Sequence, residues 1–323
     1  IPFRRGALLY SDRGDLAYAN ADGVRKLAHR SLEIKRAAID GGGTQIAVAF
    51  DRDLVVMDLD QVLPPSFAVP RNTELLGLTS SHAVVRTTVQ LGDPPGFTSG
   101  TSLVDLATHA QTLLDPRYLE AYFDGDVVAG QFLGEWNHLQ VWNGTSRAFE
   151  LDRVASYLID RGQIYYVDLD GAIWRQAMTG PRVSIGHVPS TLRTTMANGN
   201  TTVMAMMLDG DDVVLSVFDT RGLQFVRASG ELLDLGTTGF DWRLFGHARD
   251  GAWWLVDYAT AKLYRSLGGV LTAVEIDRDA SAIKVFPDRV MVMSIDDTAT
   301  ELDLEGRVIR TISDVQSARE LPP

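Results

Sequence analysis

The sequence predicts an all-β protein made of about eight short repeats, and two observations lead to this fold class. Turn sequences recur between extended apolar segments at a mean spacing of about 40 residues. Strand-forming runs bounded by turns are frequent, Val213–Phe218 and Val290–Met293 among them, and no amphipathic helix longer than two turns is evident. Strands without intervening helices exclude folds in which strands and helices alternate.

The first repeated feature is a turn between two extended apolar segments. Glycine, asparagine and aspartate are favoured there because tight hairpins need residues that accept a positive φ. The clearest copies are Asp12–Gly14, Gly41–Gly43, Asp124–Gly125 and Asp160–Gly162. Weaker copies lie at Ser80–Ser81, Asn198–Gly199, Asp250–Gly251 and Pro287–Asp288.

The second repeated feature is an apolar strand that ends in aspartate or asparagine. It occurs at Asn20, Asp58, Asp105, Asn143, Asp168, Asp219, Asp257 and Asp303. These markers also average about 40 residues apart, which is the length of one four-stranded blade of a β-propeller. We therefore expect a β-propeller of eight four-stranded antiparallel blades. The first two turns lie closer together than the others, which leaves seven blades as the alternative.

A single blade cannot bury both faces of its sheet. Blades that stack side by side bury these faces against their neighbours, so the repeats favour one large domain over residues 1–323. Two segments resemble known propeller families. Asp219 ends a strand after Gly186–His187 at a distance similar to that in a WD repeat, and Asp168–Trp174 resembles the blades of NHL-type and gluconolactonase-type propellers. The resemblance implies an architecture and carries no specific activity.

Composition excludes several functions. The chain has no cysteine, so disulfides, thiolate metal sites and cysteine nucleophiles are absent. The net charge of −12 argues against nucleic acid or an anionic membrane as a partner. No apolar run approaches the roughly 20 residues that span a bilayer, and no signal peptide is visible. We expect a soluble protein, and the compartment is left open.

Cofactor and metal signals are weak. The acidic stretches Asp209–Asp212, Asp168–Asp170 and Asp296–Asp297 offer oxygen ligands of the kind that Ca²⁺ prefers, but none has the full EF-hand pattern. No histidine pair has the spacing of a zinc site. The sequence therefore predicts no cofactor and no metal site, with Ca²⁺ as the alternative. It contains no catalytic signature either, and no nucleophile elbow.

Basic residues form the strongest candidate for a binding site. Several arginines precede a turn aspartate at a similar distance, so each is expected at the start of the first strand of a blade. In a propeller these starts gather around the mouth of the central channel, where guanidinium groups suit a carboxylate, a phosphate or an acidic peptide. Trp242 is expected beside them. The candidate residues are Arg5, Arg36, Arg117, Arg153, Arg193, Trp242 and Arg243. Alternatively, each arginine pairs with a neighbouring aspartate or glutamate.

Two functions are compatible with these sequence features. The first is a non-enzymatic binding module that presents its loops and channel face to a protein or peptide, and it needs no catalytic signature. The second is a propeller-fold hydrolase, lactonase or lyase that acts on a small anionic substrate at the channel. We favour the binding module. Leu91–Thr101, with Pro94 and Pro95, is expected to form a long loop and is a candidate recognition element.

Overall fold

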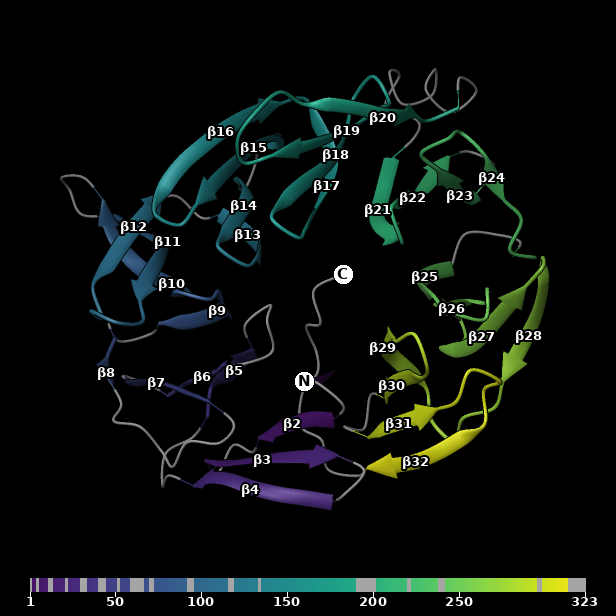
Figure 1. Cartoon of the computed structure of the whole chain (residues 1–323), viewed down its shortest axis with the longest axis horizontal. Helices are drawn as coiled ribbons and strands as arrows, with labels where there is room; N and C mark the ends of the chain where they lie inside the picture. The colour runs from purple at the N-terminus through teal and green to yellow at the C-terminus, as the bar shows by residue number, and fades with distance from the viewer. Residues whose placement is uncertain are drawn as a thin grey trace. The chain divides into compact units, whose positions relative to one another are not determined.

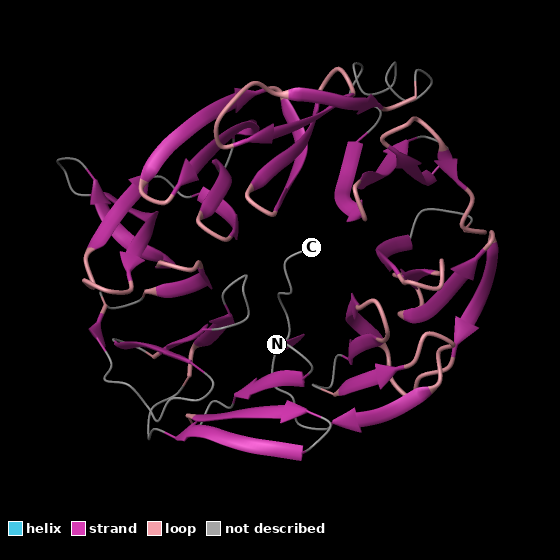
Figure 2. Ribbon diagram, viewed as in Figure 1, coloured by secondary structure: helices cyan, strands magenta, loops and turns pink. Residues whose placement is uncertain are grey.

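The computed structural model confirms the all-β class, because the residues that it describes form strands and turns without a helix (Figure 2). The described residues are 2–3, 6–10, 14–20, 23–29, 34–39, 45–50, 53–58, 67–69, 73–91, 96–115, 119–132, 135–189, 202–219, 222–237, 242–294 and 298–312. They form eight four-stranded sheets, each built from four consecutive antiparallel strands.

The chain divides into two compact units. The first consists of Ile1–Val154, Ile159–Tyr165 and Gln176–Arg182, and the second of Ala155–Leu158, Tyr166–Arg175 and Val183–Pro323. The expectation of a single domain over 1–323 stays a prediction. Strands of one sheet, β17 to β20, contribute to both units.

Four complete sheets belong to the first unit (Figure 1). Their strands are β1 (Pro2–Phe3), β2 (Gly6–Tyr10), β3 (Asp15–Asn20) and β4 (Gly23–His29); β5 (Arg36–Ile39), β6 (Gln45–Ala49), β7 (Asp53–Asp58) and β8 (Phe67–Ala68); β9 (Glu74–Leu78), β10 (His82–Leu91), β11 (Gly96–Asp105) and β12 (Gln111–Asp115); and β13 (Leu119–Asp124), β14 (Val127–Phe132), β15 (Glu135–Asn143) and β16 (Ser146–Asp152). The sheet shared by the units has β17 (Val154–Asp160), β18 (Gln163–Asp168), β19 (Ala172–Ala177) and β20 (Val183–His187).

Three complete sheets belong to the second unit. Their strands are β21 (Thr202–Asp209), β22 (Asp212–Asp219), β23 (Gly222–Arg227) and β24 (Leu232–Leu233); β25 (Trp242–His247), β26 (Trp253–Asp257), β27 (Lys262–Leu267) and β28 (Val270–Val274); and β29 (Ala280–Val285), β30 (Val290–Ser294), β31 (Ala299–Leu302) and β32 (Val308–Ile312).

Every sheet has two distinct ends. The turns between its first and second strands and between its third and fourth strands lie at one end, which we call the hairpin end. The first strand begins at the opposite end, where the turn between the second and third strands also lies, and we call this the start end. The predicted turns at Ser80–Ser81, Asp124–Gly125, Asp160–Gly162, Asp250–Gly251 and Pro287–Asp288 are confirmed at hairpin ends.

One sequence prediction lies outside the described residues and another needs correction. The turn expected at Asn198–Gly199 lies outside them, and the turn between β21 and β22 lies at Gly210–Asp211. The expected loop over Leu91–Thr101 is largely strand. Leu91 ends β10 and pairs with Gly96 in β11, and the two strands pair in register as far as His82 and Asp105. The glycines in this segment lack side chains that would signal a strand, which is why the sequence suggested a loop.

The hydrophobic core of each unit lies between consecutive sheets. One cluster in the first unit joins β1–β4 to β5–β8, and further clusters join β5–β8 to β9–β12 and β9–β12 to β13–β16. In the second unit, clusters join β21–β24 to β25–β28 and β25–β28 to β29–β32. The adjacent Trp253 and Trp254 enter different clusters, as expected from the alternation of side chains along a strand. Burial between neighbouring faces is thus the main source of stability.

Candidate functional site

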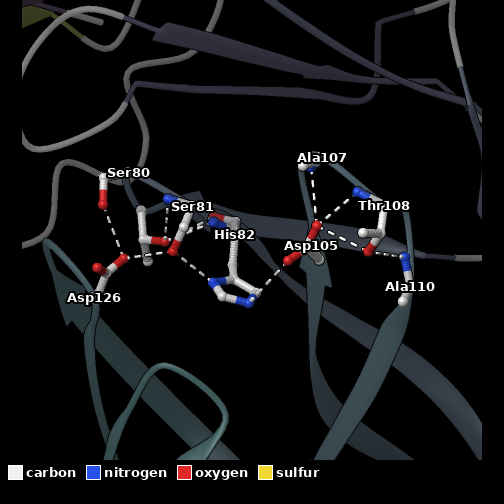
Figure 3. Close-up of polar contacts among 9 residues, drawn as sticks. Ser80, Ser81, His82, Asp105, Ala107, Thr108, Ala110 and Asp126 are labelled. Carbon is white, nitrogen blue, oxygen red and sulfur yellow. Dashed lines mark hydrogen bonds and ion pairs between the residues drawn. The ribbon is translucent and has the colours of Figure 1, made fainter.

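The hairpin ends of neighbouring sheets are joined by side-chain hydrogen bonds. Asp126, in the turn after β13, accepts hydrogen bonds at Oδ1 from the hydroxyls of Ser81 at 2.8 Å and Ser80 at 2.9 Å, both in the turn after β9 (Figure 3). In the same way, the backbone N–H of Gly162 donates to Oδ2 of Asp124 at 3.3 Å. We call such a contact between the hairpin ends of two sheets a clasp.

Ser81, His82 and Asp105 contain the residue types of a hydrolytic triad, but their geometry differs from one. Ser81 donates its only proton to Asp126, so its oxygen accepts a hydrogen bond from Nδ1 of His82, 2.8 Å away (Figure 3). An activated serine needs the opposite polarity, with histidine as the acceptor. Nε2 of His82 lies 3.9 Å from Oδ2 of Asp105. The arrangement therefore suits a clasp and not a nucleophile.

Asp105 is occupied by its own turn. Its Oδ1 accepts hydrogen bonds from the backbone N–H of Thr108 at 2.7 Å, from the Thr108 hydroxyl at 2.9 Å and from the N–H of Ala107 at 2.9 Å (Figure 3). The backbone hydrogen bond from Thr108 is the largest influence that lowers the pKa of this carboxyl. Asp105 thus remains an anion that orders the turn before β12.

The Asp126 clasp makes a testable contribution to stability. Burial raises the pKa of Asp126, but hydrogen bonds from Ser81, Ser80 and Thr79 outweigh it, and the net pKa is lowered. A lowered pKa means that the stabilisation is present above the unfolded value of about 3.9 and is lost as the pH falls through the folded value. An Asp126→Ala variant should lose about 1 kcal/mol at pH 7, a figure that allows for solvent screening.

Urea unfolding at pH 7, 5 and 3 checks this prediction. The difference in free energy of unfolding between wild type and Asp126→Ala should be equal at pH 7 and 5 and smaller at pH 3. Asp277→Ala, which removes an exposed carboxylate between β28 and β29, is the comparison for general effects of charge. A difference that stays constant down to pH 3 would contradict the assigned role of the Asp126 carboxylate.

A second polar cluster joins sheets β21–β24 and β25–β28. Oδ1 of Asp209 lies 2.5 Å from Nδ1 of His247, and the His247 ring stacks on Trp253 with centroids 4.3 Å apart. Arg227 donates to Asp209 at 3.0 Å and to Asp212 at 2.8 Å. The hydrogen bond to Asp212 is the main reason that the pKa of Arg227 is raised. The sequence suggested Asp209 and Asp212 as Ca²⁺ ligands. In the structure both carboxylates instead bind the guanidinium of Arg227.

Metal-binding geometry is not found elsewhere in the described ranges either. They contain no group of three histidine, aspartate or glutamate side chains placed to hold an ion. Asp168 accepts hydrogen bonds from the backbone of its own turn and from the indole N–H of Trp174. Asp296 and Asp297 lie outside the described residues.

Among the candidate arginines at the start ends, Arg36 is paired. It is the first residue of β5 and donates to Glu74 at 3.0 Å, at the beginning of β9 in the next sheet. Arg86 of β10 donates to the other oxygen of Glu74 at 2.8 Å. Arg36 thus follows the alternative interpretation, in which a strand-end arginine pairs with a neighbouring carboxylate. Arg86 and Glu74 carried no sequence signal because their contact depends on sheet register.

Of the candidates Arg5, Arg117, Arg153 and Arg193, the structure describes only Arg153. Arg153 is exposed and directly precedes β17, with a φ of 64°, and it has contacts with other residues. Arg5, Arg117 and, from the second unit, Arg193 lie outside the described residues. A gathering of the seven candidates around one channel mouth therefore stays a prediction.

Arg243 differs from Arg36, because its guanidinium is exposed and rests on aromatic rings. It is the second residue of β25, and its Cζ lies 5.1 Å from the ring centroid of Tyr258 and 6.0 Å from that of Phe245. The Tyr258 side chain, in the turn after β26, is 61% exposed. No carboxylate among the described residues pairs with Arg243. Tyr258 could not be identified from the sequence, since a tyrosine after a strand has no distinctive pattern.

Trp242 lies on the opposite face of the same sheet. Its ring meets Tyr264 edge to face with centroids 5.0 Å apart, and it packs against the cluster that joins β21–β24 to β25–β28. Trp242 and Arg243 are adjacent in a strand, so their side chains point to opposite faces. Trp242 therefore contributes mainly to packing between sheets, while Arg243 and Tyr258 form an exposed cation–aromatic pair. We call Arg243, Phe245 and Tyr258 the arginine–tyrosine site.

Comparison with known proteins establishes the architecture. The chain has a TM-score of 0.58 and 12% identity to BamB from Moraxella catarrhalis, with 93% of this chain and 92% of that one covered. It has a TM-score of 0.60 and 10% identity to a eukaryotic initiation factor, over 96% and 85%, and a TM-score of 0.52 and 11% identity to Hsv2 from Kluyveromyces lactis, over 88% and 99%. The fold is a β-propeller.

The likeness to these propellers is one of fold alone. No family model matches the sequence, and no curated protein matches it. The predicted propeller architecture is thus confirmed without a specific family. In the described part of the chain, no helix is long and apolar enough to cross a membrane.

Proposed function

We propose that this β-propeller is a non-enzymatic binding module and that its arginine–tyrosine site contacts carboxylates of a partner protein. The observation that supports the proposal is the exposed guanidinium of Arg243, which rests on Tyr258 and Phe245. Arginine and tyrosine at exposed sites are the residue types that contribute most to protein interfaces. Aromatic rings beneath the guanidinium also restrict its motion, which reduces the entropy lost on binding.

Carboxylate is the chemistry that this site suits best. A guanidinium presents several N–H donors in a plane and binds a carboxylate through two parallel hydrogen bonds. The net charge of −12 opposes the approach of an acidic partner at long range. At physiological salt this repulsion is screened beyond about 8 Å, whereas the direct contact at Arg243 is retained. We therefore expect weak, salt-sensitive binding to a short acidic segment rather than to a highly charged surface.

The probe is a pair of fluorescein-labelled peptides, one with glutamates and one with glutamines at the same positions. Fluorescence anisotropy should show that the wild-type protein binds the glutamate peptide more tightly. An Arg243→Gln variant should lose at least about tenfold in affinity, equivalent to about 1.4 kcal/mol. Arg243→Lys should fall between the two, because lysine keeps the charge but not the planar donors.

Arg147→Gln is the matched control. Arg147 is exposed on β16 and pairs with Glu150 at 2.6 Å, so its loss should leave peptide binding unchanged. Equal binding of both peptides, or equal binding by wild type and Arg243→Gln, would refute the proposed role. The alternative of a propeller hydrolase, lactonase or lyase has no specific support, since Ser81 and Asp126 are held in a clasp and Asp105 is held in its own turn.

A further inference from the structure

The hairpin of β10 and β11 is longer than the two strands that flank it (Figure 1). β10 and β11 have 10 residues each and pair along their whole length without a shift in register. β9 pairs with β10 only over Ala83–Arg86, and β12 pairs with β11 only over Thr101–Val104. Residues 87–91 and 96–100 therefore form a two-stranded extension, and no described strand pairs with it on either side.

Such an extension is a site where a third strand adds stability. Two strands alone are marginally stable in water, because the backbone groups along both of their edges stay unpaired. Five residues of a strand span roughly 16 Å, at about 3.3 Å per residue. The extension includes most of Leu91–Thr101, the segment that the sequence indicated as a recognition element.

The outward direction of the backbone groups of β11 follows from a hydrogen bond at its end. The N–H of Asp105 donates to the carbonyl of Ala110, directly before β12, so the backbone groups of Asp105 point to the β12 side. Along a strand, every second residue points its N–H and C=O to the same side. Phe97 and Ser99 therefore present these groups on the β12 side, beyond the end of β12. We call the β12 side of residues 96–100 the free edge.

The free edge is more accessible to a strand than the opposite edge of the extension, on β10. Gly96 and Gly100 have no side chains, and a glycine within a strand often marks the close approach of another backbone. The edge of β10 begins instead at Arg86, which binds Glu74, and Glu74 also binds Arg36. These charged groups would lose contact with water if a strand were added beside them.

The free edge also lacks the features that prevent strand addition. Residues 96–100 contain no proline and no charged residue, and the pairing of β10 with β11 has no bulge. Pro116, which directly follows β12, has no backbone N–H, which explains why the pairing of β12 with β11 ends at Asp115. A flat, uncharged edge of this kind suits an extended segment that binds through backbone hydrogen bonds.

We propose that the free edge binds an extended, uncharged segment of a partner protein as an added antiparallel strand. Backbone hydrogen bonds to Phe97 and Ser99 supply the affinity, and β-branched residues such as valine and threonine favour the extended conformation of the segment. A second copy of this chain fits less well, since two chains that each have a net charge of −12 repel each other. The proposal uses no residue of the arginine–tyrosine site and does not depend on it.

The probe is a fluorescein-labelled peptide with a core of alternating threonine and valine, flanked by serines. Fluorescence anisotropy should show binding to wild-type protein, and hydrogen exchange followed by mass spectrometry should show protection of residues 96–100. Ser99→Pro should weaken binding at least about tenfold, because proline removes the outward N–H and places its ring on the free edge. The N–H of Ser99 takes no part in the pairing with β10, so the hairpin should be retained.

Two variants serve as matched controls. Ser99→Ala keeps the backbone N–H and should bind the peptide as wild type does. Gln90→Pro changes the opposite edge, because the carbonyl of His82 accepts a hydrogen bond from Thr79 on the β9 side and Gln90 faces the same side. It should also bind as wild type does. Circular dichroism and thermal unfolding check that every variant is folded, and Phe97→Pro with Phe97→Ala provides an independent second pair.

A peptide with the same side chains but with every core nitrogen methylated should not bind, because it cannot donate backbone hydrogen bonds. Equal binding of the methylated peptide, unchanged binding by both Ser99→Pro and Phe97→Pro, or loss of binding in Gln90→Pro alone would overturn the proposal. Analytical ultracentrifugation tests the other occupant. A dimer of wild type that Ser99→Pro abolishes, without binding of the peptide, would assign the free edge to a second copy of the chain instead.

Discussion

A Trp254→Ala variant should lose about 4 kcal/mol in its free energy of unfolding, the usual cost of removing a large buried aromatic side chain. Trp254 is completely buried between sheets β25–β28 and β29–β32. It contacts a cluster of aliphatic residues on both sheets, so its removal leaves a cavity that two rigid sheets cannot close. Urea unfolding monitored by circular dichroism gives the measurement.

Trp254→Phe separates packing from hydrogen bonding at this position. Nε1 of Trp254 is buried and has no hydrogen-bond partner among the described residues. Phenylalanine removes that unsatisfied donor while it keeps most of the apolar contact, so its cost should be well below that of alanine. If the two variants lost equal stability, the indole nitrogen would have to make a contact that the structure does not show.

Replacement of Gly186 by alanine is expected to cost about 3 kcal/mol. A Cβ at this position would lie 1.8 Å from the carbonyl oxygen of Ala228 in the neighbouring sheet. The obstacle is backbone, so it cannot rotate away, and the hydrogen bond from His187 to the same oxygen would also be disturbed. This clash is relieved only if β20 moves away from the turn before β24.

Ser184→Ala is the control for Gly186→Ala, because Ser184 is exposed on the same strand and its loss should change stability by no more than about 0.5 kcal/mol. Gly77→Ala extends the comparison. A Cβ there would overlap the Phe123 ring, a side chain, so a second substitution of Phe123→Leu should restore part of the stability. Equal stability of Gly186→Ala and Ser184→Ala would show that the two sheets are farther apart than described.

The fold was largely predictable because hairpin turns have local causes. Asp124–Gly125 and Asp250–Gly251 carry the turn chemistry in two adjacent residues, and both lie at hairpin ends as expected. The position of a turn within its repeat is less certain. Asp105 ends a third strand whereas Asp168 ends a second strand, although both follow an apolar run. Local sequence identifies a strand end but not its place in the sheet.

The candidate site was less predictable, because its contacts depend on register between sheets. The sequence placed Arg36 at the start of a first strand, where it lies, but could not show that Glu74 of the next sheet would face it. Similarly, the sequence identified Arg243 but not Tyr258, the ring on which the guanidinium packs. The Ser81–Asp126 clasp has no local signature at all, since each partner is an ordinary turn residue.

In the second unit, the fourth strand of each sheet contacts a turn that lies later in the sequence. This order affects how the unit folds during synthesis. The end of β20 contacts the turn before β24, the residues after β24 contact the turn before β28, and the end of β28 contacts the turn before β32. On a ribosome the chain emerges from its N-terminus. The last strand of each newly synthesised sheet therefore lacks its contacts until the next sheet has been synthesised. If translation is interrupted, the most recent sheet is expected to be exposed to proteolysis.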